Sequence, residues 1–237
     1  MRVQSLRVVS IIMYVLCVLA AIMLIVPSFT AIKLSHGEKF ISAVIVFAFG
    51  YMASRLMCIG VDIKRAEKIM KATFLWLFII YAVVVIDFTL ISDSFGSNIS
   101  NIFLLSKAQI REYIKDNTNI IPFGTVKLYI NAYKADNIEQ YIVFENLLGN
   151  FSVFMPFAFF LPIIYKKANK AFVFLGLISV AVFVIEILQI VFLTGSADID
   201  DFILNVAGAM AAFGILKLGC VKRFVNKIVR RSETDAD

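Results

Sequence analysis

Three aspartates lie within four positions of one another in the segment GSADIDDFILN. Asp198, Asp200 and Asp201 stand where two long apolar stretches meet, 171–193 and 202–220. Carboxylates held this close repel one another unless a cation, a shared proton or water offsets their charge. Their types and spacing favour one of three chemistries: binding of cationic or hydrogen-bond-donating groups, proton transfer, or coordination of a divalent cation through oxygen.

A fourth carboxylate, Glu186, interrupts the apolar stretch 171–193. It precedes the end of that stretch by about eight residues, which places it about 12 Å below the membrane surface at about 1.5 Å per residue. An ionised carboxylate at that depth is costly unless it is paired, protonated or facing water, so it is a functional candidate. Gln189 follows on the same helical face. The alternative is a protonated Glu186 that only packs against a neighbouring helix.

Amide side chains recur where the two neighbouring apolar stretches begin. Asn146 and Asn150 are four positions apart, and so are Asp201 and Asn205, so each pair shares a helical face. Short connections require these helices to pack as antiparallel neighbours. The sequence therefore predicts one polar cluster, made of Asn146, Asn150, Glu186, Gln189, Asp198, Asp200, Asp201 and Asn205.

Helix capping and helix packing account for part of this cluster. Asp200 or Asp201 would cap the helix that follows, because acidic groups favour the positive amino end of a helix. Asn205 would bond across a helix interface where Gly208 allows close approach. Capping explains one or two aspartates, but it does not explain three together with the buried Glu186.

Six apolar stretches are long enough to cross a bilayer, each of about 18 residues or more. The chain is 61% hydrophobic with a mean hydropathy of +0.89, more apolar surface than a soluble domain of this size can bury. We therefore expect an all-α polytopic membrane helix bundle with a retained first helix rather than a cleaved signal peptide. The six predicted spans are about 8–26, 40–59, 72–92, 147–165, 171–193 and 202–220.

The net charge of +6 follows the predicted topology. Most Lys and Arg residues fall in segments that are internal if the amino terminus is inside, which is the positive-inside pattern. We expect a multi-pass plasma-membrane protein with both termini cytoplasmic and the three aspartates outside. The basic excess therefore gives no support to nucleic-acid binding.

The long segment 93–146 is also expected to be external, and it is too long for a plain connection. Helical periodicity over 104–116 and 125–144 predicts short helices on the outer membrane surface. Between them, NIIPFG predicts a rigid bend, with Gly124 permitting the turn. Further on, Pro156 and Pro162 should bend the fourth span and widen the cluster into a pocket.

Three stretches carry a family resemblance, in this order: NIIPFGTVKLYI, NLLGNFSVFMPFAFFLP and EILQIVFLTGSADIDDFILNVAGAMAAFG. They resemble the VanZ-like family over about residues 75–215. Ala158 replaces a common glycine, and no Arg accompanies GSAD. The family pattern falls on Asn119, Pro122, Phe123, Asn146, Asn150, Pro156, Glu186, Gln189, Asp198, Asp200, Asp201 and Asn205.

The resemblance divides the chain into an amino-terminal two-helix addition (1–71), a VanZ-like membrane domain (72–220) and a charged cytoplasmic tail (221–237). It implies resistance to teicoplanin-like, lipid-anchored glycopeptides without remodelling of the cell-wall precursor. Such a factor would bind the antibiotic or alter its access to the lipid-linked precursor. An acidic, amide-lined site suits ammonium, hydroxyl and amide groups, with Asn119 joining the cluster as a binding residue.

The alternative is a membrane enzyme acting on a lipid-linked cell-wall substrate, with Glu186 as general acid or base. The sequence lacks a clear nucleophile with an adjacent base, since Ser196 has no His or Lys partner. A proton-coupled transporter and an envelope scaffold are further alternatives. No cofactor and no metal are expected, because the only histidine, His36, lies in another loop and the three cysteines match no metal motif. The ligand, the oligomeric state and the role of the first two helices stay open.

Overall fold

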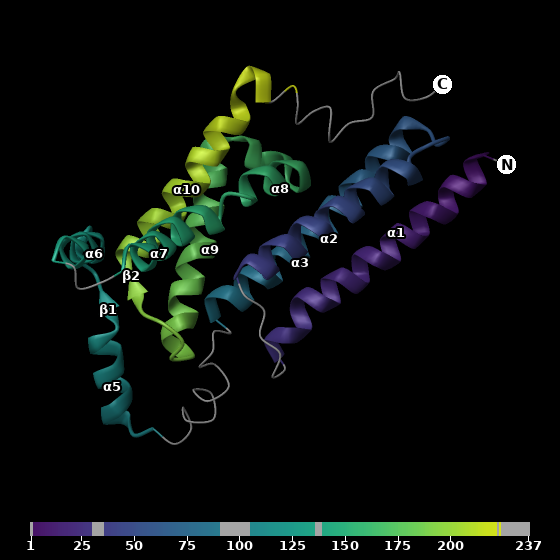
Figure 1. Ribbon diagram of the computed structural model, residues 1–237. Coiled ribbons are helices and arrows are strands. Elements are labelled where there is room, and N and C mark those ends of the chain that lie inside the picture. The colour runs from purple at the N-terminus through teal and green to yellow at the C-terminus, as the bar shows by residue number, and fades with distance from the viewer. Residues whose placement is uncertain (1, 30–35, 91–104, 136–138, 222, 224–237) are drawn as a thin grey trace. The chain divides into compact units, whose positions relative to one another are not determined.

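The computed structural model describes residues 2–29, 36–90, 105–135, 139–221 and 223 (Figure 1). The chain forms two compact units, one of Met1–Val84 with Leu216–Asp237 and the other of Val85–Ile215. The predicted tail 221–237 lies almost wholly outside the described residues, as does the beginning of the long segment 93–146.

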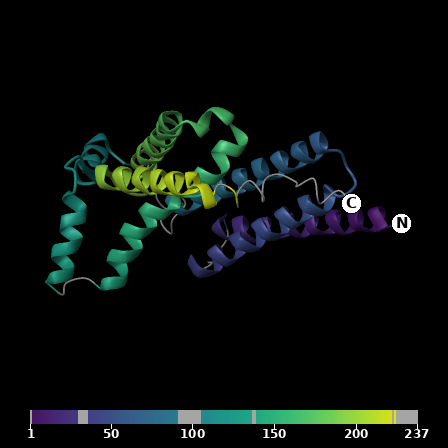
Figure 2. The same cartoon turned by 90° about the horizontal axis from the view of Figure 1, so that it is seen from above.

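The first unit is built on α1 (Arg2–Ile25), α2 (His36–Met57) and the greater part of α3 (Ile63–Leu90), with a 3₁₀ turn at Val26–Phe29. α1 and α2 run side by side (Figure 2). Buried Ser10 donates to the carbonyl of Ala53 over 2.8 Å, and the hydroxyls of Tyr14 and Thr73 lie 2.8 Å apart. Such hydrogen bonds stabilise apolar helices that gain little from hydrophobic association within a bilayer.

Five helical segments are long and apolar enough to cross a membrane, by length and composition. They confirm an all-α, multi-pass membrane protein, although the second of the six predicted spans, 40–59, is not shown. That stretch corresponds to α2, whose apolar part, Ile41–Met57, is shorter than the other five. The five are Val3–Ile25, Ile63–Leu90, Tyr141–Ile164, Ala171–Val191 and Ile199–Lys217.

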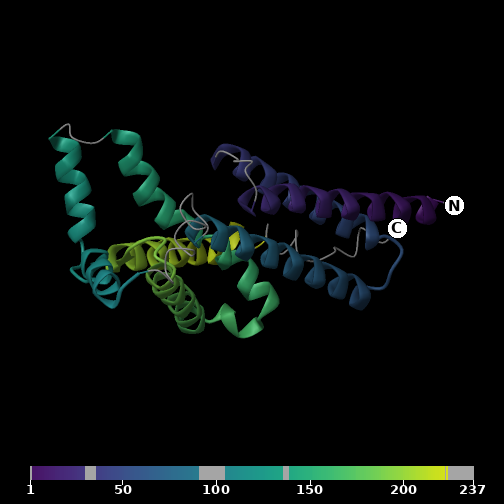
Figure 3. The same cartoon turned by 90° about the horizontal axis from the view of Figure 1, so that it is seen from below.

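The second unit contains the long connecting segment and the last three spans. Two short helices are present where the sequence predicts them, although the second ends at Lys134 rather than running to 144. α5 and α6 are separate helices (Figure 3), and β1 lies between them (Figure 1). The elements are α5 (Lys107–Asp116), β1 (Thr118–Asn119), α6 (Gly124–Lys134), α7 (Gln140–Val153), α8 (Phe157–Ile164), a 3₁₀ turn (Lys166–Asn169), α9 (Ala171–Val191), β2 (Ala197–Asp198) and α10 (Ile199–Lys217).

The predicted bend in the fourth span is present at Pro156 as a break between two helices, whereas Pro162 lies inside α8. α7 ends at Val153 and α8 begins at Phe157, with Pro156 as the residue that precedes α8. Proline favours the beginning of a helix because its missing N–H has no partner there anyway. The turn is filled by Phe154, which is buried and lies 4.9 Å from the ring of Phe157.

One face of α9 explains where Glu186 points. Phe174, Ile178, Val182 and Glu186 follow one another at intervals of four, and all four are buried. Phe174 stacks on Phe213 of α10 with ring centroids 4.6 Å apart. Residues spaced by four share a face, so Glu186 continues the packed stripe of α9 rather than its exposed surface.

Candidate functional site

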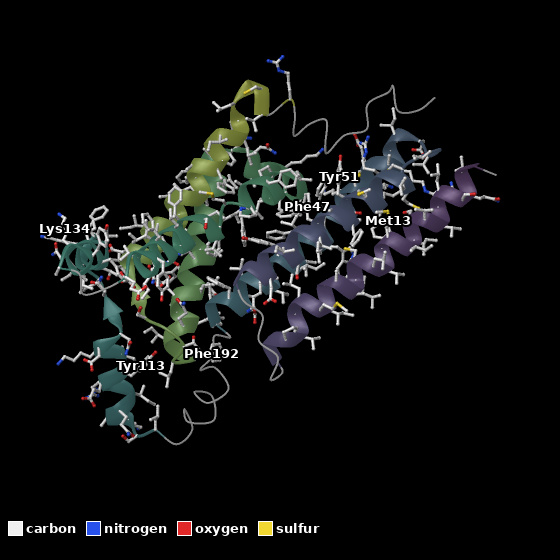
Figure 4. The ribbon with its side chains drawn as sticks, in the orientation of Figure 1. Met13, Phe47, Tyr51, Tyr113, Lys134 and Phe192 are labelled. Carbon is white, nitrogen blue, oxygen red and sulfur yellow. The ribbon has the colours of Figure 1, made fainter. Side chains whose placement is uncertain are left out.

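A two-residue parallel sheet brings the long connecting segment against the α9–α10 loop. Thr118 pairs with Ala197 and Asn119 pairs with Asp198. The phenolic hydroxyl of Tyr113 on α5, labelled in Figure 4, donates to the carbonyl of Gly195 over 2.8 Å. These contacts join residues about eighty positions apart in the chain, so they position the polar residues of both segments together.

Asp198 organises the junction, and its side chain is buried. Its Oδ1 accepts the N–H of Asp200 at 2.8 Å, which makes Asp198 the amino-terminal cap of α10. The same oxygen accepts the amide of Asn119 at 3.0 Å, while Oδ2 accepts the hydroxyl of Thr125. The backbone N–H of Asp198 donates to Oε2 of Glu186 at 3.1 Å. One aspartate thus connects α6, β1, α9 and α10.

Asp200 holds the amino end of α6, and only 2% of its surface is exposed. Its two oxygens accept the N–H groups of Phe123 and Val126, the latter at 3.0 Å. The first N–H groups of a helix have no partner within it, and the helix dipole favours a negative charge there. The sequence predicts that Asp200 or Asp201 caps α10. In the structure Asp198 caps α10, and Asp200 caps α6.

The turn that precedes α6 also differs from the sequence prediction. The left-handed residue is Phe123, with φ of 62°, whereas Gly124 is the first residue of α6. A bulky residue in this region is strained unless its surroundings hold it there. The hydrogen bond from the N–H of Phe123 to Asp200 holds the backbone of this turn.

Asp201 joins α10 to α7. Its Oδ1 accepts the side-chain amide of Asn150, and its backbone carbonyl accepts the amide of Asn205 at 2.7 Å. Oδ1 of Asn205 is buried and receives no hydrogen bond from the residues that the structure describes. A buried acceptor without a donor is rare in folded proteins, so this oxygen calls for an explanation.

Glu186 is 8% exposed, and its Oε2 accepts the N–H of Asp198. Within the described part of the chain, Oε1 of Glu186 and Oδ2 of Asp201 receive no hydrogen bond. The charges of Asp198 and Asp201 act on Glu186, so the carboxylates interact electrostatically. Together with the amide side chains that accompany them, the four carboxylates form the acidic cluster: Asn119, Asn150, Glu186, Asp198, Asp200, Asp201 and Asn205.

Two predicted site residues make their contacts elsewhere. Asn146 is exposed on α7 and donates to the carbonyl of Ile142 in its own helix at 2.9 Å. Gln189 donates to the carbonyl of Thr89, at the end of α3, at 3.2 Å. Gln189 therefore ties α9 to the end of α3, while neither side chain bonds to the four carboxylates.

Sequence reasoning missed Thr125 and Tyr129 of α6. The two residues are four positions apart, so they lie on the same face of α6. Once Thr125 is known to contact Asp198, this spacing would also place Tyr129 near the cluster. Burial raises the pKa of Tyr129 above its usual range, and the negative charges of Asp201 and Asp198 raise it further. Tyr129 therefore stays protonated and available as a hydrogen-bond donor near the cluster.

A family model described as VanZ/LLP1 matches residues 78–221, more than half of the chain. The chain belongs to the VanZ/LLP1 family. The VanZ/LLP1 match includes the whole acidic cluster and all the elements that hold it. It confirms the resemblance predicted from the three motifs. No curated protein and no solved structure matched the chain.

Proposed function

We propose that this VanZ/LLP1 membrane protein lowers sensitivity to teicoplanin-like, lipid-anchored glycopeptides without catalysing a reaction. The acidic cluster would bind ammonium, hydroxyl or amide groups of such a molecule at the outer membrane surface. The charge pattern of the loops supports an external position, because the α9–α10 loop alternates with segments rich in Lys and Arg.

The observation that carries this proposal is the set of unfilled acceptors. Asp198 and Asp200 direct both of their oxygens to donors of the protein. Glu186, Asp201 and Asn205 each retain one oxygen without a protein donor in the described residues. Of these three oxygens, that of Asn205 is fully buried. A partner that brings N–H or O–H groups or positive charge would satisfy it and the two carboxylate oxygens.

The first two aspartates thus build the framework, while the remaining acceptors provide binding capacity. The described hydrogen-bonding partners of the four carboxylates are backbone N–H, amide and hydroxyl groups, which bring no formal charge. Any of these carboxylates that is ionised therefore has its negative charge available to a cationic group. A bare phosphate or pyrophosphate would be repelled.

The substitution Glu186→Gln tests the charge. Glutamine has the size of glutamate and one acceptor oxygen, but it cannot carry a negative charge. A charge-assisted hydrogen bond contributes about 1.5–3 kcal/mol, which corresponds to roughly tenfold or more in affinity. In a susceptible host, teicoplanin protection should fall several-fold at unchanged protein level, and Asp201→Asn should act likewise. Vancomycin susceptibility measured in parallel shows whether the effect is specific.

Asn146→Ala is the matched control, because Asn146 is exposed and bonds only within α7. Full protection by Glu186→Gln and Asp201→Asn would show that the cluster is only structural. Product formed by the purified protein from a lipid-linked cell-wall precursor would favour the enzyme alternative instead.

A further inference from the structure

The connection between β1 and α6 exposes a run of apolar residues. Ile120, Ile121 and Phe123 are 79%, 68% and 64% exposed, and Pro122 between them is exposed as well. Leu128 on α6 adds a further apolar side chain that is 65% exposed. Large apolar side chains gathered in this way mark an interaction surface rather than a surface adapted to water.

The backbone of this run is held in place. The N–H of Ile121 donates to Oδ1 of Asn119 at 3.0 Å, and the carbonyl of Ile121 accepts the N–H of Gly124 at 3.1 Å. Asp200 holds the N–H of Phe123. Pro122 restricts its own backbone and that of Ile121. The apolar side chains therefore project from a preformed turn, which loses little conformational entropy on binding.

The contact with Asp200 also sets the depth of the turn. Asp200 is the second residue of α10, a helix long and apolar enough to cross the membrane. When α10 spans the membrane, the backbone of Phe123 lies level with its first turn, where hydrocarbon meets the headgroups. The bond from Asp198 to Glu186 puts that carboxylate near the same level, rather than about 12 Å deeper as the sequence predicts. Apolar side chains exposed at this level would face acyl chains.

The charge of α6 fits the same surroundings. α6 has no Asp or Glu, and it carries exposed Lys127 and Lys134. The two lysines are seven positions apart, so they share one face, and Lys134 is labelled at the end of α6 in Figure 4. A short helix with apolar and basic side chains is typical of an element that lies in the headgroup region of anionic membranes.

We propose that residues 120–134 form a membrane anchor, with Ile120, Ile121, Phe123 and Leu128 among the acyl chains. Lys127 and Lys134 would meet the phosphates of anionic lipid headgroups. Because Asp200 binds the turn, lipid would hold α6 in register with the acidic cluster. This inference is independent of the proposed function, since the anchor would serve any activity of the cluster.

A single reporter tryptophan tests the anchor, because the chain has only one Trp, Trp76. Full-length Trp76→Phe protein carrying Ile121→Trp would be reconstituted in phosphatidylcholine–phosphatidylglycerol vesicles with acyl chains brominated at defined positions. We expect blue-shifted emission, loss of most of the intensity to the brominated lipids, and little quenching by aqueous acrylamide. Ile120→Trp repeats the measurement at a second position.

Glu112→Trp on the exposed surface of α5 is the control, for which the reverse quenching pattern is expected. Acrylamide quenching of Ile120→Trp and Ile121→Trp equal to that of the control would overturn the anchor. Blue-shifted emission that brominated lipids leave unchanged, and that depends on protein concentration, would assign the surface to a second copy and would also overturn it. To test the basic face, the double variant Lys127→Gln with Lys134→Gln should reduce quenching of the reporter tryptophan by brominated lipids in vesicles that contain phosphatidylglycerol. Unchanged quenching would show that the two lysines do not contact the headgroups.

Discussion

Replacing Asp200 by asparagine is expected to release α6 from its place against α10. Both oxygens of Asp200 accept backbone N–H groups, whereas an amide offers one acceptor and would direct its NH₂ group at the other N–H. A lost charge-assisted hydrogen bond together with a buried unpaired donor costs about 3 kcal/mol. Opening of this contact should therefore become about a hundredfold more frequent.

Hydrogen exchange measured by mass spectrometry on the detergent-solubilised protein would report this opening. Exchange should rise in the peptide that contains Phe123 and Val126, while the core of α9 stays protected. Asp116→Asn is the control, because Asp116 is exposed at the end of α5 and such surface changes alter stability by only about 0.5 kcal/mol. Equal exchange in Asp200→Asn and wild type would show that Asp200 does not hold α6.

Replacing Gly208 by alanine is expected to separate α10 from α7. A Cβ at Gly208 would overlap the backbone carbonyl of Phe151, which unlike a flexible side chain cannot move aside. Small residues permit this kind of close helix crossing in membranes. Overpacking a well-packed interior costs typically about 1–3 kcal/mol, and a clash with backbone belongs at or above the upper end of that range.

Gly214→Ala provides a control within the same helix, because no atom lies within 4 Å of a Cβ built there. Alanine in an open helical position should be neutral or stabilising by up to about 1 kcal/mol. The unfolding temperature in detergent should therefore fall for Gly208→Ala and stay unchanged or rise for Gly214→Ala. If Gly208→Ala were as stable as Gly214→Ala, the crossing of α10 over Phe151 would be wrong.

The sequence was sufficient for the features that depend on local pattern. Length and hydropathy identify the five helices that are long enough to cross a membrane, but they also predict a span at 40–59 that is not shown. Pro156 predicts the break between α7 and α8. Positions four apart were enough to bring Asn150 of α7 to Asp201 of α10. The same spacing also placed Asn146 in the cluster and Asn205 across a helix interface, whereas both amides donate within their own helices. These inferences rest on helical periodicity and on short connections, which act over a few residues.

The parts that could not be predicted depend on contacts distant in the chain. Two residues per strand give no alternating pattern, so the pairing of Asn119 with Asp198 had no local signal. The left-handed turn falls on Phe123 although Gly124 is the easier choice by intrinsic preference. Asp200 caps α6, from which it is separated by more than seventy residues, and the two-stranded sheet joins the same two segments.

These contacts suggest why the three aspartates occur together. Asp198 caps α10 and fixes Asn119 and Thr125, while Asp200 fixes α6. Asp201 fixes α7 through Asn150. Most of their hydrogen-bonding capacity thus builds the junction, and the proposed ligand would use only the oxygens that remain. Variants of Asp198 or Asp200 are therefore expected to lose function together with a change in structure. Glu186→Gln should instead lose function while the structure stays the same.

Calorimetric titration of teicoplanin into the purified protein in lipid nanodiscs is the most direct test of the central claim. Empty nanodiscs would correct for partition of the antibiotic into lipid. The account predicts saturable binding that Asn146→Ala leaves unchanged and that Glu186→Gln weakens about tenfold, as expected for loss of a charge-assisted contact. Saturable binding of equal affinity in wild type and Glu186→Gln, or no binding beyond that of empty nanodiscs, would contradict it.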